Sequence, residues 1–282
     1  MRWLVTGAGG MLGRDVVSRL AAEGHVVTAA TRGDLDVTDP AACADAVRGH
    51  DVVVNCAAWT AVDDAETQEA AAFDVNAVAA ANVARAAAEA RARLAHVSTD
   101  YVFDGAATSP YREDAPMAPR SAYGRTKAAG EWAVRAEWDD VLVVRTAWLY
   151  GTHGRCFPKT IAGAAATRDH LDVVDDQVGQ PTWTVDVADL LVRLVEAGVP
   201  AGTYHGTSSG QVSWCGFARE VVAAAGLDPD MVRPTTSDAF PRPAPRPAYS
   251  VLGHDALGAA GVEPIGPWQE RWAAAAPSVL AG

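Results

Sequence analysis

Short apolar segments alternate with stretches of helical periodicity along the first half of the chain. Continuous apolar or β-branched runs are typical of strands buried on both faces, and apolar residues three to four positions apart are typical of amphipathic helices. The predicted strands are residues 2–6, 25–30, 51–55, 94–98 and 141–145. The predicted helices are a first one that ends at Gly24, followed by residues 40–48, 65–91 and 123–136. This order predicts a Rossmann-type α/β fold, in which a doubly wound parallel sheet carries helices on both faces.

The pattern becomes irregular after Gly151. The predicted elements there are a helix near 157–167, a strand at 171–174, a helix at about 185–197 and a helix after Ser213. Five prolines occur from Pro234 to Pro247, which disfavours a regular helix or strand in that segment. We therefore expect residues 1–150 to form an NAD(P)-binding domain, joined by the helix at about 185–197. Residues 151–282 are expected to form mainly a smaller C-terminal substrate-binding lobe.

The composition excludes several classes of protein. The 282 residues include 35 acidic and 23 basic side chains, a net charge of −12, so the chain would repel nucleic acid and anionic membrane surfaces. No apolar run reaches the length of a membrane span, and the first apolar run is too short for a signal peptide, which favours the cytoplasm. The four cysteines are scattered and the seven histidines form no spaced ligand set, so we expect neither disulfides nor a metal site.

Three glycines follow the first predicted strand and open the first predicted helix. Gly7, Gly10 and Gly13 give the spacing G-x-x-G-x-x-G. Because these residues lack Cβ atoms, the backbone N–H groups of such a turn and the helix N-terminus can approach the pyrophosphate of a dinucleotide closely. The alternative is an ordinary glycine-rich loop, but the strand-turn-helix context favours a dinucleotide site.

The end of the second predicted strand bears on the choice of cofactor. An acidic residue there would bind the ribose 2′-hydroxyl of NAD, whereas this chain has Thr31 and Arg32. A guanidinium suits the 2′-phosphate of NADPH, so NADPH is the expected cofactor and NADH is the second choice. The alternative is that Arg32 is merely solvated and that Asp34 or Asp36 reaches the ribose.

Tyr123 and Lys127 lie four residues apart, so they share one face of a predicted helix. A phenol can donate a proton to a developing alkoxide, and we expect the neighbouring ammonium to lower the phenol pKa. Lys127 and Lys159 are the only lysines in the chain, so a Y-x-x-x-K match is expected by chance only about 0.04 times. The alternative is an exposed pair on a helix surface, and Lys159 has no assigned role.

A third polar side chain is expected at the same edge of the sheet. Thr99 lies at the end of the fourth predicted strand, and parallel α/β proteins bind ligands at the carboxyl ends of their strands. There the Thr99 hydroxyl can donate a hydrogen bond to a carbonyl oxygen. Thr99, Tyr123 and Lys127 together are typical of the catalytic residues of a short-chain dehydrogenase.

Further segments extend this resemblance over nearly the whole chain. They are 6–13 (TGAGGMLG), 55–63 (NCAAWTAVD), 98–103 (STDYVF), 123–127 (YGRTK), 145–151 (RTAWLYG) and 176–182 (DQVGQPT), followed by Arg246-Pro247 with Ser250 and Leu252. In this order they resemble the extended short-chain dehydrogenases, and most closely the dTDP-4-dehydrorhamnose reductase family. The combination is far more specific than any single motif.

The resemblance implies a reductase that transfers a hydride from NADPH or NADH to the C4 ketone of a dTDP-4-keto-6-deoxy sugar. It implies that Tyr123 protonates the new C4 oxygen, that Lys127 binds the nicotinamide ribose and lowers the tyrosine pKa, and that Thr99 polarises the carbonyl. The implied cofactor contacts are Gly10, Met11 and Leu12 at the pyrophosphate, Asp36 and Val37 at the adenine, and Ala57, Ala58 and Trp59 along the cofactor trough. The implied sugar contacts are Asp100 and Trp148, although a tryptophan that closes a strand is often part of the core.

One more arginine is a candidate for the substrate. A planar guanidinium suits phosphate oxygens, so Arg246 is a candidate contact for the substrate diphosphate. The alternative is a solvated arginine in a proline-rich loop. Some rhamnose-pathway reductases dimerise through a magnesium ion held by glutamates, but only Asp15 matches the first of those positions here. We therefore assign no metal, and both a monomer and a homodimer stay open.

Two types of related enzyme fit this sequence less well, and two other functions are alternatives. Dehydratases of similar fold place an Asp-Glu pair after the threonine, whereas Tyr101 follows Asp100 here, and epimerases that retain NAD fit Arg32 poorly. The first alternative is a 4-ketoreductase for another dTDP-deoxysugar of an antibiotic pathway, because pocket shape decides stereochemistry. The second is a non-catalytic dinucleotide-binding regulatory subunit, like the auxiliary subunit of methionine adenosyltransferase, which is similar to this family. Retention of Thr99 and Tyr123 with their lysine disfavours it.

Overall fold

A six-stranded parallel sheet forms the centre of the molecule. The computed structural model describes residues 1–281, and the strand order of this sheet is β10-β5-β4-β3-β1-β2. The strands are β1 (Arg2–Thr6), β2 (Val26–Ala30), β3 (Val52–Asn55), β4 (Arg93–Thr99), β5 (Val141–Thr146) and β10 (Gly202–His205). Every neighbouring pair is parallel, which confirms the predicted α/β sheet. The strand order reverses between β1 and β3, which marks the crevice where such sheets bind ligands.

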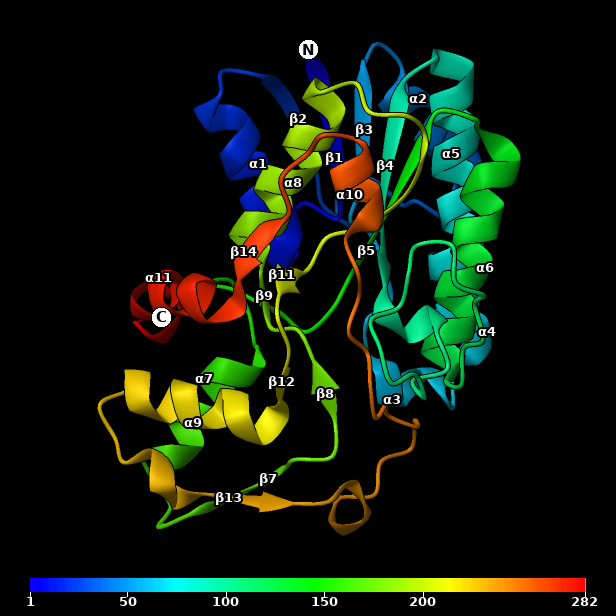
Figure 1. Cartoon of the computed structure of the whole chain (residues 1–282). Helices are drawn as coiled ribbons and strands as arrows, with labels where there is room; N and C mark the ends of the chain where they lie inside the picture. Colours follow the sequence, from blue (N-terminus) through cyan, green and yellow to red (C-terminus); the bar gives the residue numbers. More distant parts are fainter. Residues whose placement is uncertain (282) are drawn as a thin grey trace.

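Helices cover both faces of this sheet (Figure 1). One face carries α1 (Met11–Ala22), α8 (Thr184–Glu196) and α10 (Asp255–Ala259), and the other carries α2 (Pro40–Val47), α5 (Ala79–Ala90) and α6 (Ala122–Glu137). Along β1, Trp3 and Val5 are buried on the α1 and α8 side, whereas Leu4 is buried on the α2 and α5 side. The inner strands β1, β3, β4 and β5 therefore need apolar side chains on both faces, which explains their continuous apolar runs.

The sheet contains one strand that the sequence pattern did not predict. β10 pairs with β5 at the edge of the sheet, with Gly202 opposite Leu142 and His205 opposite Arg145. Its sequence, Gly-Thr-Tyr-His, lacks an apolar run, because an edge strand has only one neighbour and two of its residues are half-exposed. The strand follows α8, which packs on α1.

The single helix predicted at 65–91 is wrong. The chain forms α3 (Val62–Ala65) and α4 (Glu69–Phe73), then a π-helical turn (Asp74–Val78), and only then α5. Gln68 breaks the helix with φ −129° and ψ 39°, outside the helical region. The alanine-rich composition hides both interruptions, because alanine fits any of these helical forms. The π-helical turn brings Asn76 next to the candidate active site.

A smaller lobe lies beyond the carboxyl edge of the sheet (Figure 1). Its helices are α7 (Phe157–Ala165), α9 (Trp214–Ala224) and α11 (Trp268–Leu280). Its paired strands are β6 (Leu149–Tyr150) with β9 (Thr182–Trp183), β7 (Leu171–Val174) with β13 (Val232–Thr235), β8 (Val178–Gly179) with β12 (Val212–Ser213), and β11 (Ser208–Ser209) with β14 (Ile265–Pro267). Short 3-10 turns lie at Asp100–Val102, Pro229–Met231 and Ser237–Ala239. Aromatic rings build its core, chiefly Tyr150, Phe217 and Trp272, which meet at centroid distances of 5.4 to 5.7 Å.

Residues 248–253 connect the lobe back to the sheet. The backbone N–H of Tyr249 donates to the Gly105 carbonyl at 3.0 Å, and that of Ser250 donates to the Val178 carbonyl at 2.9 Å. One segment therefore binds both the loop after β4 and strand β8 of the lobe. Among the described residues, no helix is long and apolar enough to cross a bilayer.

Candidate active site

The carboxyl ends of β1, β3, β4 and β5 meet at one edge of the sheet. Gly7 follows β1, Cys56 follows β3, Asp100 follows β4 and Ala147 follows β5. This edge adjoins the point where the strand order reverses, so segments distant in the sequence converge there. The predicted cofactor and catalytic residues lie on these segments, on the loop after β2 and on the start of α6.

The turn after β1 leaves no room for side chains. Gly7 has φ +66°, in the left-handed region, and a Cβ there would lie 2.7 Å from the backbone nitrogen of Ala57. A Cβ on Gly13 would lie 2.3 Å from the Gly7 carbonyl oxygen. Gly10 precedes α1 without a side chain that could cap the helix, so the N–H groups of Met11 and Leu12 begin an uncapped helix end. Such a cradle of bare backbone fits the pyrophosphate of a dinucleotide.

Gly13→Ala is expected to weaken dinucleotide binding. The new methyl group would meet the Gly7 carbonyl and the Ala8 Cα atom, both in the backbone, so the turn itself has to shift. An overpacking cost of about 2 kcal/mol corresponds to a roughly 30-fold higher Kd for NADPH, measurable by fluorescence titration. Gly163→Ala in α7 is the matched control, since no heavy atom lies within 4 Å of a Cβ built there. Unchanged NADPH affinity in Gly13→Ala would contradict the assignment of the cradle.

Arg32 lies exposed just after β2, while the acidic residues beside it are occupied within their own loop. A threonine hydroxyl and backbone N–H hold the Asp34 carboxylate at 2.6 and 3.0 Å, and another pair holds the Asp36 carboxylate at 2.7 and 3.0 Å. These hydrogen bonds lower the pKa of both carboxyls. Val37 is half-buried against the core between α2 and α5. The Arg32 guanidinium is therefore an exposed cation at the end of β2, and a guanidinium suits a phosphate.

A buried asparagine fixes the strip that follows β3, which consists of Ala57, Ala58 and Trp59. The side-chain oxygen of Asn76 accepts a hydrogen bond from the Trp59 N–H at 2.8 Å, and its amide donates to the Trp59 carbonyl at 3.1 Å. The same amide donates to the Thr126 hydroxyl of α6 at 3.0 Å. Asn76 was not predicted as a site residue, although a polar residue within an alanine-rich apolar stretch was a usable signal.

Thr99 and Tyr123 meet at the end of β4. The Thr99 hydroxyl donates to Asp100 Oδ1 at 2.9 Å and also interacts with the Tyr123 phenol. Gly124 allows this approach, because a Cβ there would lie 2.3 Å from the Tyr101 carbonyl oxygen. The ring of Tyr101 meets the ring of Tyr123 edge-on, with 5.5 Å between centroids. The first turn of α6 is thus packed directly on the loop after β4.

Lys127 lies one helical turn beyond Tyr123 and is 2% exposed. Its Nζ donates to the Val97 carbonyl of β4 at 2.8 Å. Burial lowers the pKa of Lys127 to about 8, while the charges of Glu131 and Cys56 raise it. The ammonium is therefore poised to change protonation just above neutral pH.

Tyr123 does not have the lowered pKa that the tyrosine-lysine spacing predicted. Burial raises the pKa of Tyr123 to about 12, the charge of Asp100 adds to this increase, and the Thr99 hydroxyl opposes it. The expectation that Lys127 lowers this pKa is wrong for this structure, because removal of the phenol from water dominates. The phenol is accordingly protonated at neutral pH, as a proton donor must be.

Asp100 is a buried acid at the centre of the site. It is 3% exposed, and burial raises its pKa to about 6, although hydrogen bonds with Thr99 and Ser250 lower it. Its Oδ1 accepts the bond from Thr99, but within residues 1–281 its Oδ2 has no partner. A buried carboxylate oxygen without a partner is costly, so this atom suits a hydroxyl donor of a bound ligand.

Trp148 adopts a backbone conformation that is rare for its residue type. Its φ of +48° lies in the left-handed region, which costs about 1 kcal/mol for a residue with a Cβ. The indole is half-buried and stacks on Trp214 of the lobe, with 3.5 Å between centroids and 5° between planes. It is therefore not an ordinary core residue, and its strained backbone is typical of functional positions.

Arg246 is not a merely solvated arginine. Its guanidinium donates to Asp63 Oδ2 at 2.8 Å, across 183 residues of sequence. The Asp63 carboxylate also accepts from the Ala244 N–H at 3.3 Å, so the proline-rich loop is tied to α3. Arg246 and Arg120 line a cavity of about 400 Å³ next to Tyr101. Neither Asp63 nor Arg120 was predicted as a site residue.

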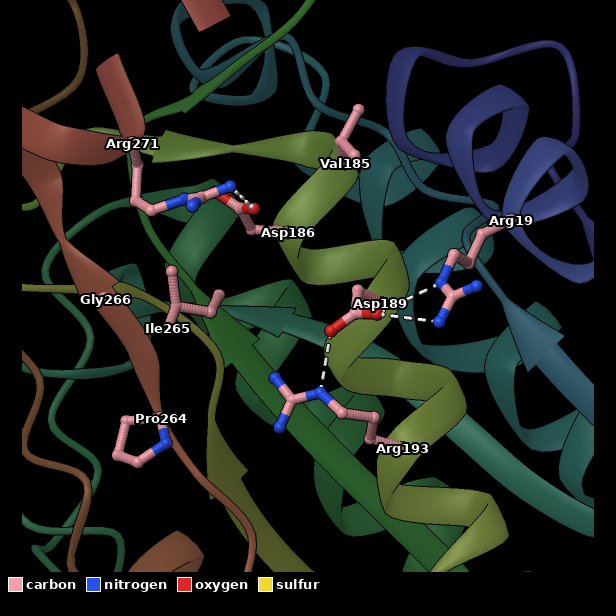
Figure 2. Close-up of a pocket in the computed structure, with 9 residues that line it drawn as sticks. All are labelled: Arg19, Val185, Asp186, Asp189, Arg193, Pro264, Ile265, Gly266 and Arg271. Carbon is pink, nitrogen blue, oxygen red and sulfur yellow. Dashed lines mark hydrogen bonds and ion pairs between the residues drawn. The ribbon is translucent and has the colours of Figure 1, made fainter. Parts of the chain in front are cut away.

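A second cavity, of about 360 Å³, lies on the outer side of α8 (Figure 2). Asp189 of α8 binds Arg19 at 3.0 Å and Arg193 at 2.7 Å, and Asp186 binds Arg271 at 2.6 Å. These pairs tie α8 to α1 and α11. The residues that line this cavity include no member of the glycine turn and none of the residues around Tyr123. The network is best explained as support for helix packing.

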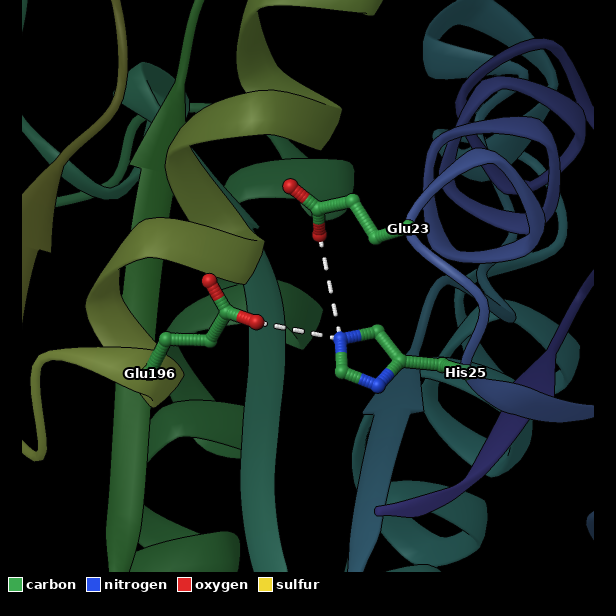
Figure 3. Close-up of side chains that lie close together, drawn as sticks. All are labelled: Glu23, His25 and Glu196. Carbon is green, nitrogen blue, oxygen red and sulfur yellow. Dashed lines mark hydrogen bonds and ion pairs between the residues drawn. The ribbon is translucent and has the colours of Figure 1, made fainter.

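A cluster with metal-binding side chains lies at the opposite edge of the sheet. His25 Nε2 is 3.0 Å from Glu196 and 3.7 Å from Glu23 (Figure 3). His25 directly precedes β2, so the cluster lies at the amino edge of the sheet, away from Tyr123. Glu23 also pairs with Arg19 at 2.5 Å. His25 therefore joins the end of α1 to the end of α8 by polar contacts, and we place no metal there.

Two positions left open by the sequence have local partners. The Nζ of Lys159 in α7 donates to the Thr152 carbonyl at 2.6 Å, so this lysine closes the loop between β6 and α7. Asp15 is buried in α1 with a pKa raised by burial, and His153 lies 3.7 Å away. Lys159 thus ties α7 of the lobe to the loop at 151–156. Asp15 ties α1, the first helix of the sheet domain, to the same loop.

Comparisons with known proteins agree with these motifs. The family model described as "RmlD substrate binding domain" matches residues 1–280. A Streptomyces antibioticus protein, a probable dTDP-4,6-dihydroxy-2-methyloxan-3-one 4-ketoreductase, is 50% identical over 100% of this chain and 96% of its own. A Streptomyces griseus dTDP-4-dehydrorhamnose reductase is 50% identical over 95% of this chain and 90% of its own. The crystal structure of a Bacillus anthracis dTDP-4-dehydrorhamnose reductase in complex with NADP is 34% identical, covers 97% of this chain and 98% of that one, and superposes with a TM-score of 0.94.

Proposed function

The chain belongs to the RmlD substrate binding domain family, and from that membership we propose that it reduces the C4 ketone of a dTDP-4-keto-6-deoxy sugar with NADPH. The single observation that carries the proposal is the meeting of Thr99, Asp100 and Tyr123 at the same carboxyl edge of the sheet as the glycine turn, with Lys127 buried one turn further along α6. A non-catalytic subunit has no need of this arrangement.

The residues of the chain supply binding and proton transfer. NADPH, when bound, supplies the hydride for C4. The Gly7 to Gly13 turn holds the pyrophosphate, Arg32 the 2′-phosphate, and the strip after β3 the nicotinamide half. Tyr123 Oη gives its proton to the C4 oxygen, the Thr99 hydroxyl polarises the carbonyl, and the Lys127 ammonium binds the nicotinamide ribose.

The division of labour between the two parts of the chain is also a proposal. Residues 1–150, with α8, bind the cofactor, and residues 151–282 bind mainly the dTDP-sugar. The helix contacts of α8 with α1 and the separate aromatic core of the lobe support this division. The cavity beside Arg246 supports a contact between this arginine and the substrate diphosphate.

A 4-ketoreductase for another deoxysugar is the second candidate. The Streptomyces antibioticus 4-ketoreductase and the Streptomyces griseus dTDP-4-dehydrorhamnose reductase are each 50% identical to this chain, so identity favours neither sugar. The deciding experiment is to incubate the protein with NADPH and a panel of dTDP-4-keto sugars, then identify each product by NMR. No NADPH oxidation with any of these sugars would overturn the proposed function.

Arg32→Ala is expected to raise the KM for NADPH about tenfold and to leave the KM for NADH unchanged, because one charged contact to the 2′-phosphate is lost. The exposed Arg48→Ala at the end of α2 is the control, since its guanidinium pairs with Asp45 at 2.9 Å. Initial rates with each cofactor at a saturating keto sugar give both constants. An equal change for the two cofactors would contradict a phosphate contact.

The rate of reduction is expected to fall as pH rises through about 8. The lowered pKa of Lys127 means that the ammonium loses its proton in this range, whereas Tyr123, with a pKa of about 12, keeps its own. The profile of kcat/KM between pH 6 and 10 measures this. In the Glu131→Gln variant, kcat/KM is expected to fall at lower pH than in wild type, because the charge that raises the pKa of Lys127 is removed. A kcat/KM that stays constant between pH 6 and 10 would show that the reaction does not require a charged Lys127.

A further inference from the structure

The indoles of Trp148 and Trp214 join the two parts of the molecule. Trp148 follows β5 by two residues at the carboxyl edge of the sheet, and Trp214 begins α9 in the lobe. Their rings are nearly parallel, 5° apart in plane and 3.5 Å apart at the centroids. Phe157 of α7 braces Trp214 from the lobe, with 4.3 Å between ring centroids. The position of the Trp148 indole therefore depends on the lobe.

A glycine lies directly against the same indole. A Cβ on Gly179 would lie 2.4 Å from Cε2 of Trp148 and 2.6 Å from its Nε1 and Cζ2 atoms. Gly179 belongs to β8, where it pairs with Val212 of β12, and β12 leads straight into Trp214. The bare backbone of Gly179 and the ring of Trp214 thus contact the Trp148 indole from the same part of the lobe, the β8-β12 pair and the residue that follows it.

The backbone of Trp148 indicates that this placement is imposed by its surroundings. A φ of +48° is rare for a residue with a Cβ, and such conformations persist only where neighbouring contacts determine them. The Thr182 N–H donates to the Trp148 carbonyl at 3.2 Å, and β6 pairs with β9 immediately afterwards. The indole is therefore fixed both through its backbone and through its ring.

We propose that Trp214 and Gly179 are positioning residues for the sugar pocket, which hold the Trp148 indole against the bound keto sugar. The inference rests on the proposed function. A 6-deoxy sugar carries a methyl group instead of a hydroxymethyl group, so part of its surface is apolar and suits a rigid aromatic wall. Neither residue touches the reacting atoms. Both act through Trp148, which sets how the C4 ketone lies relative to Tyr123.

Three substitutions separate this role from a purely structural one. Trp214→Leu removes the stacking partner, Trp214→Phe keeps an aromatic ring, and Gly179→Ala places a methyl group in the volume of the indole. We expect Trp214→Leu and Gly179→Ala to lower kcat/KM for the keto sugar about tenfold, mainly through KM, and Trp214→Phe to stay within about threefold of wild type. The Kd for NADPH is expected to stay within about twofold in all three. Trp132→Leu is the matched control, because that tryptophan is 62% exposed on α6.

A spectroscopic measurement reports the stack without any substrate. Two stacked indoles couple their electronic transitions, and where the transition moments are skewed within the two planes this gives an exciton couplet in circular dichroism. The couplet is expected in the wild type and in Trp132→Leu and lost in Trp214→Leu. If the couplet is lost but kcat/KM stays within about twofold of wild type, the positioning role is overturned. The same holds if Trp214→Phe, correctly folded by thermal denaturation, is as impaired as Trp214→Leu. If the wild type itself reduces none of the keto sugars, the proposed function is wrong and the positioning role falls with it.

Discussion

Tyr123→Phe is expected to lower kcat for ketone reduction by about 10²- to 10⁴-fold, the usual range for loss of a general acid. The substitution removes one hydroxyl and keeps the ring, so the edge-on contact with Tyr101 and the packing of α6 on the loop after β4 persist. The Kd for NADPH is therefore expected to stay close to that of wild type. Single-turnover NADPH oxidation and a fluorescence titration measure the two quantities.

The neighbouring phenol of Tyr101 provides a comparison for the Tyr123→Phe variant. Tyr101 lies 5.5 Å from Tyr123, and burial raises the pKa of Tyr101 as well, so both phenols are protonated at neutral pH. Tyr101→Phe is expected to reduce kcat by less than about tenfold, because Thr99 interacts with the other phenol. Tyr204→Phe, whose hydroxyl donates to the Pro200 carbonyl at 2.8 Å at the sheet edge, controls for loss of a phenol. Near-full activity of Tyr123→Phe would assign the proton to another donor.

The sequence predicted the part of the fold that apolar burial determines. Four of the six strands, β1, β3, β4 and β5, lie buried between two layers of helices, so the apolar pattern itself identified them. β2 was predicted from its apolar residues as well, although three of its five residues are exposed. β10 was missed because its sequence has no apolar run: Gly202 and Thr203 are half-exposed, and the buried His205 is accommodated by a hydrogen bond with the Gly253 carbonyl. The helix predicted at 65–91 was wrong, because an alanine-rich segment carries no signal for the break at Gln68 or for the π-helical turn.

The site could be predicted where its residues form local motifs, and not where distant segments meet. The glycine turn and the tyrosine-lysine spacing are visible within a few residues. The partners of Asn76 and of Arg246, which are Trp59 and Asp63, depend on the folded chain and could not be identified from the sequence. The prediction for the pKa of Tyr123 failed for a related reason, since burial of a phenol depends on all the segments around it.

Arg145→Met is expected to destabilise the fold by about 3–5 kcal/mol, the usual cost of removing one partner of a buried ion pair. Arg145 on β5 forms two hydrogen bonds of 2.8 Å with Glu131 on α6, and their side chains are 3% and 0% exposed. Ser98 also donates to Glu131 at 2.6 Å. Removal of the guanidinium leaves a carboxylate buried without its counter-charge. The melting temperature is expected to fall by roughly 10 °C, measurable by differential scanning calorimetry.

The double variant Glu131→Gln, Arg145→Met distinguishes two contributions to the lost stability: the loss of the ion pair, and the cost of burying the Glu131 charge without a partner. The introduced glutamine is not charged and can still accept the Ser98 hydrogen bond, so the double variant is expected to recover at least about half of the lost stability. Arg135, whose guanidinium lies 3.6 Å from Glu131, is another cation near this carboxylate. A single Arg145→Met variant as stable as wild type would mean that Arg135 moves in to replace the missing charge. In that case, adding Arg135→Met to the Arg145→Met variant is expected to produce the loss of stability that Arg145→Met alone did not show.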